Sequence, residues 1–440
     1  MIDAVISVNC PTVSGKHPSP TAIQAWKTFC SSRMVIHASI YASTAHRDAY
    51  NPMASLSTSR DALTHRGEAL RLINEEIAGF DKGQRPSETL LFAVMAMTAD
   101  PFGPSIDPSE TDIPTIRPFR LSKAAQGWQQ LFLRIRHSKI HHDGLFLLVD
   151  MAGGLNSLQD RGVAKMISHH DVLIAVQELR APKQPYVQLP ELADLVANLS
   201  LEDQKPESKS HQTSISNLEI EWKPEPSPEP YTHEAWCPGS SMPALKHSLG
   251  ESTPLSVLLT HLQRVIATEE LLARGPLPGR DPKASMLGHS ADKDALHHAI
   301  LSVPSQPELN EKGSLYEPVR LVALAFEVGI LFPLPLSFGA LTRVVRWMKA
   351  AFMEIGDLKQ IEMTEALIWI LFVGGVAALG IPERDWFVEK LAVAVERNGM
   401  TRWTELKLLL RSFIWMDEAM DEGAMNLWDD IRFYLMTARK

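Results

Sequence analysis

Helical periodicity constrains the fold of this chain more than any other feature of its sequence. From residue 316 onward, apolar residues recur at intervals of three and four, a spacing that places them on one face of an α-helix. We predict six helices in this part of the chain: Pro318–Phe332, Phe338–Ile355, Met363–Leu379, Glu383–Arg397, Trp403–Asp417 and Ala424–Thr437. No stretch of comparable length alternates apolar and polar residues as a half-buried strand does. The sequence therefore predicts an all-α, multi-helical fold.

A second helical block precedes this one, between residues 56 and 180. Ser87 is a suitable N-cap for the run that follows it, which is apolar almost all round and predicts a central buried helix. Gly153 and Gly154 follow another helical stretch and can supply its left-handed termination. Residues 1–55 have mixed character, and we predict a partly helical N-terminal segment there.

A change in composition separates the two helical blocks. Residues 200–252 are polar and rich in proline, with little periodicity, and they include the segment PEPSPEP at 224–230. This composition is typical of a disordered linker or insertion. Helical block two therefore extends over residues 254–440. Within it, residues 275–294 have the sequence GPLPGRDPKASMLGHSADKD and also resemble a loop.

Charge and cysteine content exclude several classes of protein. The chain of 440 residues carries 43 Lys+Arg against 52 Asp+Glu, a formal net charge of −9, whereas isolated nucleic-acid-binding modules are usually strongly basic. Its three cysteines, Cys10, Cys30 and Cys237, form no CxxC pair. A disulfide framework and a zinc cluster therefore both lack the necessary ligands.

Two apolar stretches have the hydrophobicity of membrane helices. Residues 319–341 contain Arg320, Glu327 and two prolines, and residues 366–381 are only 16 long, short of the roughly 20 needed to span a bilayer. We predict that both are buried helices, with no membrane contact. The N-terminus has no basic region before its short apolar stretch, so we expect no secretory signal.

The histidines offer one candidate metal site. His137 and His141 are four residues apart and would face one side of a helix. A metal ion needs three or four ligands, and the sequence identifies no others. We interpret the histidines as structural and expect no cofactor.

An acidic cluster, DEAMDE at residues 417–422, is the most enzyme-like string in the chain. Asp417 and Asp421 lie one helical turn apart, the spacing at which all-α isoprenoid synthases hold Mg²⁺ on a diphosphate, and carboxylates suit that cation. No second aspartate-rich motif of the expected form is present. We interpret the cluster as a charged turn between two helices.

Three stretches, taken in order, carry a resemblance to a known family. Residues 65–99 combine a helix, a short spacer and a buried helix. Residues 141–158 match the pattern H-x-x-G-L-x-x-h-v-x-x-x-G-G-h-x-x-L, where h is apolar. Residues 365–428 contain ALIWILFVGGVAA, then ERDWF, LLLRSFIWMDEAMDE and LWDDI. Together they resemble the fungal-specific transcription factor domain, the all-helical regulatory region of fungal zinc-cluster regulators.

The resemblance implies a nuclear regulatory protein that is not an enzyme. It implies protein partners, either other regulators or a second copy of the chain, and a small-molecule effector. The matched positions are expected to be structural: His142, Gly144, Gly153, Gly154, Trp369, Gly374, Gly375, Arg384, Trp386, Phe387, Trp415, Asp417 and Trp428. The six-cysteine cluster with which such regulators usually begin is missing from this sequence. We therefore expect no direct DNA binding by this chain alone, and activity through partners or as part of a longer factor.

Two alternatives remain at this point. The first is a Mg²⁺-dependent all-α enzyme that acts on an isoprenoid diphosphate through DEAMDE. The second is a non-catalytic helical scaffold that binds a partner through residues 200–252, since PEPSPEP favours the extended polyproline conformation that some adaptor modules bind.

Overall fold

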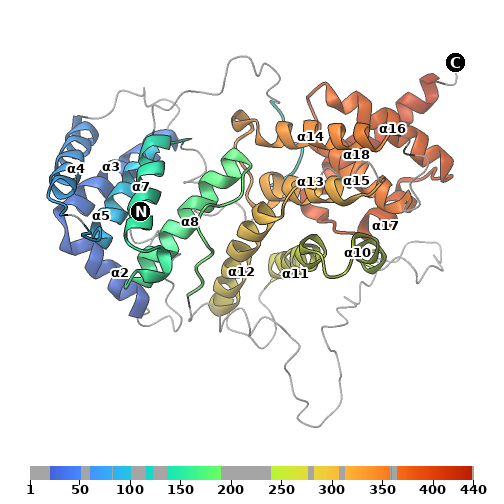
Figure 1. The fold of residues 1–440 in the computed structure, drawn as a ribbon. Coiled ribbons are helices and arrows are strands. Elements are labelled where there is room, and N and C mark those ends of the chain that lie inside the picture. The colour runs from blue at the N-terminus through green and yellow to red at the C-terminus, as the bar shows by residue number, and fades with distance from the viewer. Residues whose placement is uncertain are drawn as a thin grey trace, which may run out of the picture. The chain divides into compact units, whose positions relative to one another are not determined.

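A computed structural model gives the fold of the chain over ten ranges of residues. It describes residues 20–50, 60–81, 83–100, 115–121, 136–189, 239–275, 282–306, 313–356, 358 and 364–438. The described ranges leave out the first 19 residues of the predicted N-terminal segment and residues 200–238 of the predicted linker. Almost every described element is helical, apart from the antiparallel pair β1 (Ala99–Asp100) and β2 (Arg136–His137). The predicted all-α fold is confirmed (Figure 1).

The chain divides into two compact units. Unit 1 comprises Met1–Ser109 and Gln126–Asp194, and unit 2 comprises Glu110–Ala125 and Leu195–Lys440. Unit 1 contains α2 (Pro20–Ser31), α3 (Arg33–Tyr50), α4 (Arg60–Ala78), α5 (Glu88–Met97), α7 (Lys139–Met151), the short 3₁₀ turn η2 (Leu155–Ser157) and α8 (Arg161–Glu178). Helices α2 and α3 of the predicted N-terminal segment thus pack with those of helical block one.

Helix α5 is the centre of unit 1. The Ser87 hydroxyl accepts a hydrogen bond from the Leu90 backbone N–H at 3.0 Å, which caps the helix as predicted. The helix then packs against α2, α3, α4, α7 and α8, and its apolar run is buried on most sides. At the end of α7, Gly153 and Gly154 have φ values of 91° and 84°, and the Gly154 N–H donates to the Val149 carbonyl. This is the predicted left-handed termination.

Unit 2 is built around α15. It contains α10 (Met242–Leu249), α11 (Pro254–Arg274), α12 (Pro282–Ser302), α13 (Tyr316–Phe326), the π-helix η6 (Glu327–Leu331), the 3₁₀ turn η7 (Leu336–Phe338), α14 (Ala340–Ile355), α15 (Thr364–Ala377), α16 (Glu383–Arg397), α17 (Trp403–Arg411) and α18 (Asp417–Ala438). Helix α15 packs against α13, α14, α16, α17 and α18. Its side chains from Ala366 to Val376 are buried, which explains why its sequence has no polar face.

Two predicted loops are helical instead. Residues 242–249, assigned to the disordered linker, form α10, because Met242, Leu245 and Leu249 find a buried surface. The approach to α10 is fixed by a hydrogen bond from the Ser241 N–H to the Ser412 carbonyl at 2.8 Å. The other predicted loop, residues 275–294, contains the first half of α12. Helix α12 lacks an apolar stripe because several of its polar side chains are buried.

Candidate functional site

Several residues of the family-like motifs pack together around α15. The Trp369 Nε1–H donates to the Ile414 carbonyl at 3.0 Å, and the Trp369 ring stacks on Phe413 with centroids 5.1 Å apart. A Cβ on Gly374 would lie 2.5 Å from a ring carbon of Phe387, and one on Gly375 would lie 2.7 Å from a methyl group of Leu427. The two glycines therefore allow α16 and α18 to approach α15 closely.

Arg384 links the same three helices. Its Nη1 donates to the Gly375 carbonyl at 2.9 Å, and its Nε donates to Asp430 Oδ2 at 2.8 Å. Trp386 is half-buried and packs edge-on against Phe387, with centroids 4.9 Å apart. Trp428 is buried in α18. These motif residues support the packing of α15, α16 and α18, and none of them lines either of the two cavities described below.

The acidic cluster forms the first turns of α18, so the predicted turn between two helices was wrong. A lysine bridges its two aspartates. Lys407 Nζ donates to Asp417 Oδ1 at 2.6 Å and also to Asp421 Oδ1. Trp415 Nε1 donates to the same Asp421 oxygen at 2.9 Å. The ammonium group thus lies where a Mg²⁺ ion would have to bind. Within the described ranges, no group of three or more His, Cys, Asp or Glu side chains is arranged to hold a metal ion. This geometry does not favour the diphosphate enzyme.

The candidate histidine pair is not formed. Helix α7 begins at Lys139, so His137 lies before it in β2 while His141 lies within it. The assumption that one helix carries both residues was wrong. His137 instead packs edge-on against His170, with centroids 4.9 Å apart.

His142 lies on the buried side of α7. Its Nε2 is 3.7 Å from Asp171 Oδ1, and Asp171 also accepts hydrogen bonds from the Gln184 N–H at 2.7 Å and from Arg180 Nη2 at 3.1 Å. Burial raises the pKa of Asp171, but the neighbouring His142, the hydrogen bond from Gln184 and the charge of Arg180 outweigh it and hold this pKa below its usual range. Gly144, on the same helix, has no neighbouring atom where a Cβ would stand. His142 therefore anchors α7 to the inside of unit 1.

Sequence reasoning missed a row of buried ionisable residues on α12. The row consists of His289, Asp292, Lys293 and His297, which are between 0% and 6% exposed. Their spacing of three, one and four residues places them along one side of a helix, and this pattern is visible in the sequence. We call it the α12 polar row. Buried ionisable groups are enriched at functional sites.

Each base of the α12 polar row contacts a carboxyl group of another element, and its one acid contacts two bases. His289 Nε2 lies 2.5 Å from Glu269 Oε2, which also accepts from Lys293 Nζ at 3.3 Å. Burial raises the pKa of Glu269, yet the hydrogen bond from His289 and the charge of Lys293 outweigh burial and lower this pKa to about 2. Glu269 is therefore ionised at neutral pH.

The last contact of the row reaches the π-helix. His297 Nδ1 lies 2.8 Å from Glu327 Oε2, and both side chains are fully buried. Glu327 is the first residue of η6. π-helical turns are rare and occur frequently at functional sites.

A groove on α10 and α11 adjoins the α12 polar row. The groove has a volume of about 660 Å³ and is lined by Pro243, Lys246, Glu251, Ser256, Val257, Thr260, His261 and Arg264. Its size falls within the roughly 300–1,000 Å³ typical of small-molecule sites. His261 Nε2 lies 2.8 Å from Asp292 Oδ1, and Arg264 Nη2 donates to the same oxygen at 2.6 Å. Two groove residues are therefore bonded directly to the row.

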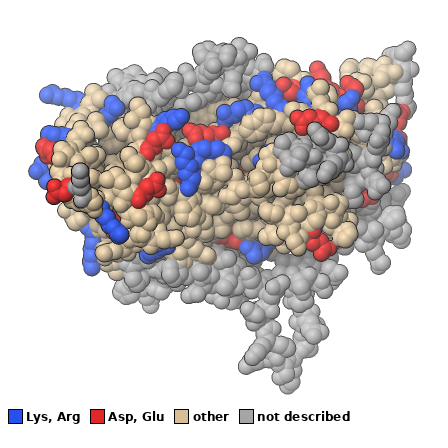
Figure 2. Space-filling view, viewed as in Figure 1, with Lys and Arg blue, Asp and Glu red and all other residues tan. Residues whose placement is uncertain are grey.

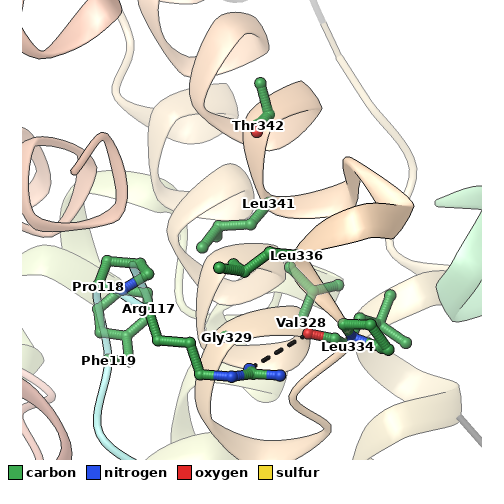
Figure 3. A pocket seen from close by; sticks show the side chains of 10 residues that line it. Arg117, Pro118, Phe119, Val328, Gly329, Leu334, Leu336, Leu341 and Thr342 are labelled. Atoms are coloured by element: carbon green, nitrogen blue, oxygen red, sulfur yellow. Dashed lines mark hydrogen bonds between the residues drawn. The ribbon is translucent and has the colours of Figure 1, made fainter. Parts of the chain in front are cut away.

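A smaller cavity marks where residues 115–121 dock within unit 2 (Figure 3). Arg117 Nη1 donates to the Leu334 carbonyl at 3.3 Å, and the Arg120 N–H donates to the Ala419 carbonyl at 2.8 Å. The Phe119 ring lies against Gly329 of η6, where a Cβ would be 2.5 Å from a ring carbon. The remaining cavity measures about 10 Å³, roughly the space of one water molecule. This contact is a packed junction and not a ligand site.

The distribution of surface charge bears on nucleic-acid binding. On the face shown in Figure 2, Lys and Arg side chains are interspersed with Asp and Glu. The described residues of this face thus form no continuous basic strip of the kind that follows a phosphate backbone. Among the helices that the structure describes, none is both long enough and apolar enough to cross a lipid bilayer.

The α10–α11 groove, with Asp292 at its junction with the α12 polar row, is the candidate functional site. It combines the larger of the two cavities described above with buried ionisable groups. Comparisons of the chain with family models, curated proteins and solved structures returned no match.

Proposed function

We propose that this chain is a non-enzymatic regulatory protein of the fungal transcription-factor type. It acts in the nucleus, through protein partners or as part of a longer factor, and it responds to a small-molecule effector. The proposal begins from the ordered motifs in the sequence. Its main structural support is that the motif residues of 365–428 pack into one core around α15, with Gly374 and Gly375 at the contacts with α16 and α18.

The α10–α11 groove supports the ligand-responsive part of the proposal. Its volume of about 660 Å³ suits a small molecule, and its residues His261 and Arg264 are bonded to the interior of unit 2 through Asp292. A ligand that competes for these bonds would change interactions of α12. Binding in the groove can therefore alter a buried helix without any catalytic step.

A tethering experiment tests the proposal. The full chain is fused to a heterologous DNA-binding domain in a fungal host that carries a reporter gene with matching sites. We expect reporter transcription to differ at least threefold from that with the DNA-binding domain alone. The Gly375→Leu variant disrupts the contact with Leu427 and should lose the effect, whereas Gly144→Ala, at an open position, should retain it.

Two results would contradict the proposal. One is an unchanged reporter signal when fractionation shows that the fusion is soluble and intact. The other is exclusion of the fluorescently tagged chain from the nucleus under all growth conditions tested.

A further inference from the structure

The α10–α11 groove carries the features of a site for one class of ligand. We propose that it binds a singly charged amphipathic organic anion, such as a medium-chain carboxylate, whose charged end lies between Lys246 and Arg264. The biological role of this site rests on the regulatory function proposed above. The binding itself depends only on the groove.

Two of the residues that would bind the charged end of the ligand lie on one side of α11. Thr260 and Arg264 are four residues apart and so lie one helical turn from each other. Lys246 Nζ donates to Thr260 Oγ1 at 3.1 Å, which brings the lysine from α10 to the same place. The groove therefore offers an ammonium, a hydroxyl and, one turn further along α11, a guanidinium, which can hold a carboxylate through charge-assisted hydrogen bonds.

Arg264 has donors available for a ligand. Its Nη2 binds Asp292, while its Nε and Nη1 make no hydrogen bond to residues that the structure describes. The side chain is 49% exposed, so a solute can reach these two donors. A guanidinium can use adjacent N–H groups to bind a carboxylate in a bidentate manner.

Apolar side chains also line the groove. Val257 precedes Thr260 by three residues and Arg264 by seven, so all three lie along the same stripe of α11. The Val257 side chain is 62% exposed, and Pro243 of α10 is a second apolar residue of the lining. Apolar atoms next to cations favour a ligand that combines a hydrocarbon tail with a charged head.

The acidic residues limit the charge of the ligand. Asp292 already accepts from both His261 and Arg264, and Glu251 lines the same groove. Together these carboxylates offset the charges of Lys246 and Arg264. A single negative charge on the ligand can use the remaining donors, while a multiply charged anion such as a diphosphate would be repelled. The site therefore discriminates by both charge and tail.

Calorimetric titration with three probes tests the assignment. Octanoate has the charge and the tail, 1-octanol has the tail alone, and inorganic phosphate has the charge alone. We expect octanoate to bind at least tenfold more tightly than either of the other probes. Equal binding of octanoate and 1-octanol would overturn the role of the cations, and equal binding of octanoate and phosphate would overturn the role of the apolar side chains.

Variants locate the site. Arg264→Met and Lys246→Met should each weaken octanoate binding at least tenfold, since each removes charge-assisted hydrogen bonds. Arg346→Met is the matched control, because Arg346 is also a partly exposed arginine paired with one acid, Glu383, and lies outside the groove. Unchanged octanoate affinity in both groove variants would refute the proposal. If Arg264→Met fails to fold, Lys246→Met decides, because its ammonium is exposed and bonds only Thr260 in the described chain.

The binding result and the reporter result can fail independently. Octanoate binding that depends on Lys246 and Arg264, together with an inactive fusion, would support the site and contradict the proposed function. An active fusion with no octanoate binding would contradict the site alone.

Discussion

Gly423→Ala tests how residues 115–121 are held in unit 2. Gly423 lies near the start of α18, and a Cβ at this position would be 2.4 Å from the Pro118 backbone oxygen and 2.9 Å from a methyl group of Val376. A backbone carbonyl cannot rotate away as the end of a side chain can. We therefore expect the alanine to displace residues 115–121 from their place against α18 and Gly329.

The size of the effect follows from what the displacement loses. Phe119 is only 2% exposed, and exposing a phenylalanine costs about 2 to 3 kcal/mol. The hydrogen bond from Arg120 to Ala419 contributes about 1 kcal/mol more. Replacing glycine by alanine inside a helix returns about 1 kcal/mol. The net loss in the free energy of unfolding of unit 2 is therefore about 2 to 3 kcal/mol.

Amide hydrogen exchange measured by mass spectrometry follows the two units separately. Peptides from α15 and α18 should exchange faster in Gly423→Ala, and trypsin should cleave after Arg120 more rapidly. Gly144→Ala is the matched control, since it makes the same change inside α7 with no neighbouring atom within 4 Å. It should slow exchange in unit 1, because only the gain of about 1 kcal/mol in helix propensity remains.

A double variant gives the refuting result. If Gly423→Ala already displaces residues 115–121, then adding Phe119→Ala should cost little more, and the two changes should be strongly non-additive. Additive losses, or unchanged tryptic cleavage in Gly423→Ala, would show that the segment stays in place and that the reasoning is wrong.

Three further predictions concern the buried and partly buried charges of unit 2. The pKa of Glu269 falls from 4.5 to about 2 on folding, so its ionisation contributes stability above pH 4.5 that is lost as the pH falls through 2. Glu269→Gln should flatten the pH dependence of the free energy of unfolding by up to about 3 kcal/mol, as measured by urea unfolding between pH 5 and 2. His297→Leu leaves the Glu327 carboxylate buried without its partner and should cost at least about 3 kcal/mol, whereas His297→Leu with Glu327→Leu should recover most of that loss in the same assay. Lys407→Met leaves two neighbouring carboxylates without their shared cation and should lower the free energy of unfolding by about 1 kcal/mol, while millimolar Mg²⁺ should leave the wild-type protein unchanged; a rise in stability with Mg²⁺ would favour the metal-dependent alternative.

The class of fold and several helices of unit 2 were predictable from the sequence. Helical periodicity is a local property that arises from the burial of one side of each helix, so α14, α16 and the start of α17 could be predicted from their apolar spacing. The predicted end of α17 at Asp417 was wrong, because the helix ends at Arg411 and Asp417 begins α18. The start of α5 at Ser87 and the end of α7 at Gly153 were also predictable, because a cap depends on hydrogen bonds to residues a few positions away.

Helices α10 and α12 could not be recognised in this way. Helix α10 has only 8 residues, and the partners that bury Met242 and fix Ser241 come from distant parts of the chain. Helix α12 has no apolar stripe, because His289, Lys293 and His297 are buried against carboxylates on other elements. Their spacing was visible in the sequence, but a buried polar row and a solvated one look alike until the partners are known.

The candidate site became recognisable only from the packing of the helices. Spacing suggested chemistry for Asp417 with Asp421 and for His137 with His141, yet Lys407 bridges the first pair and the start of α7 separates the second. The α10–α11 groove had no signal in the sequence, because Lys246 and Arg264 belong to different helices and line one groove only when those helices pack. Periodicity specifies which side of a helix is buried, while a site depends on which side chains of separate helices meet, and that is set by long-range packing.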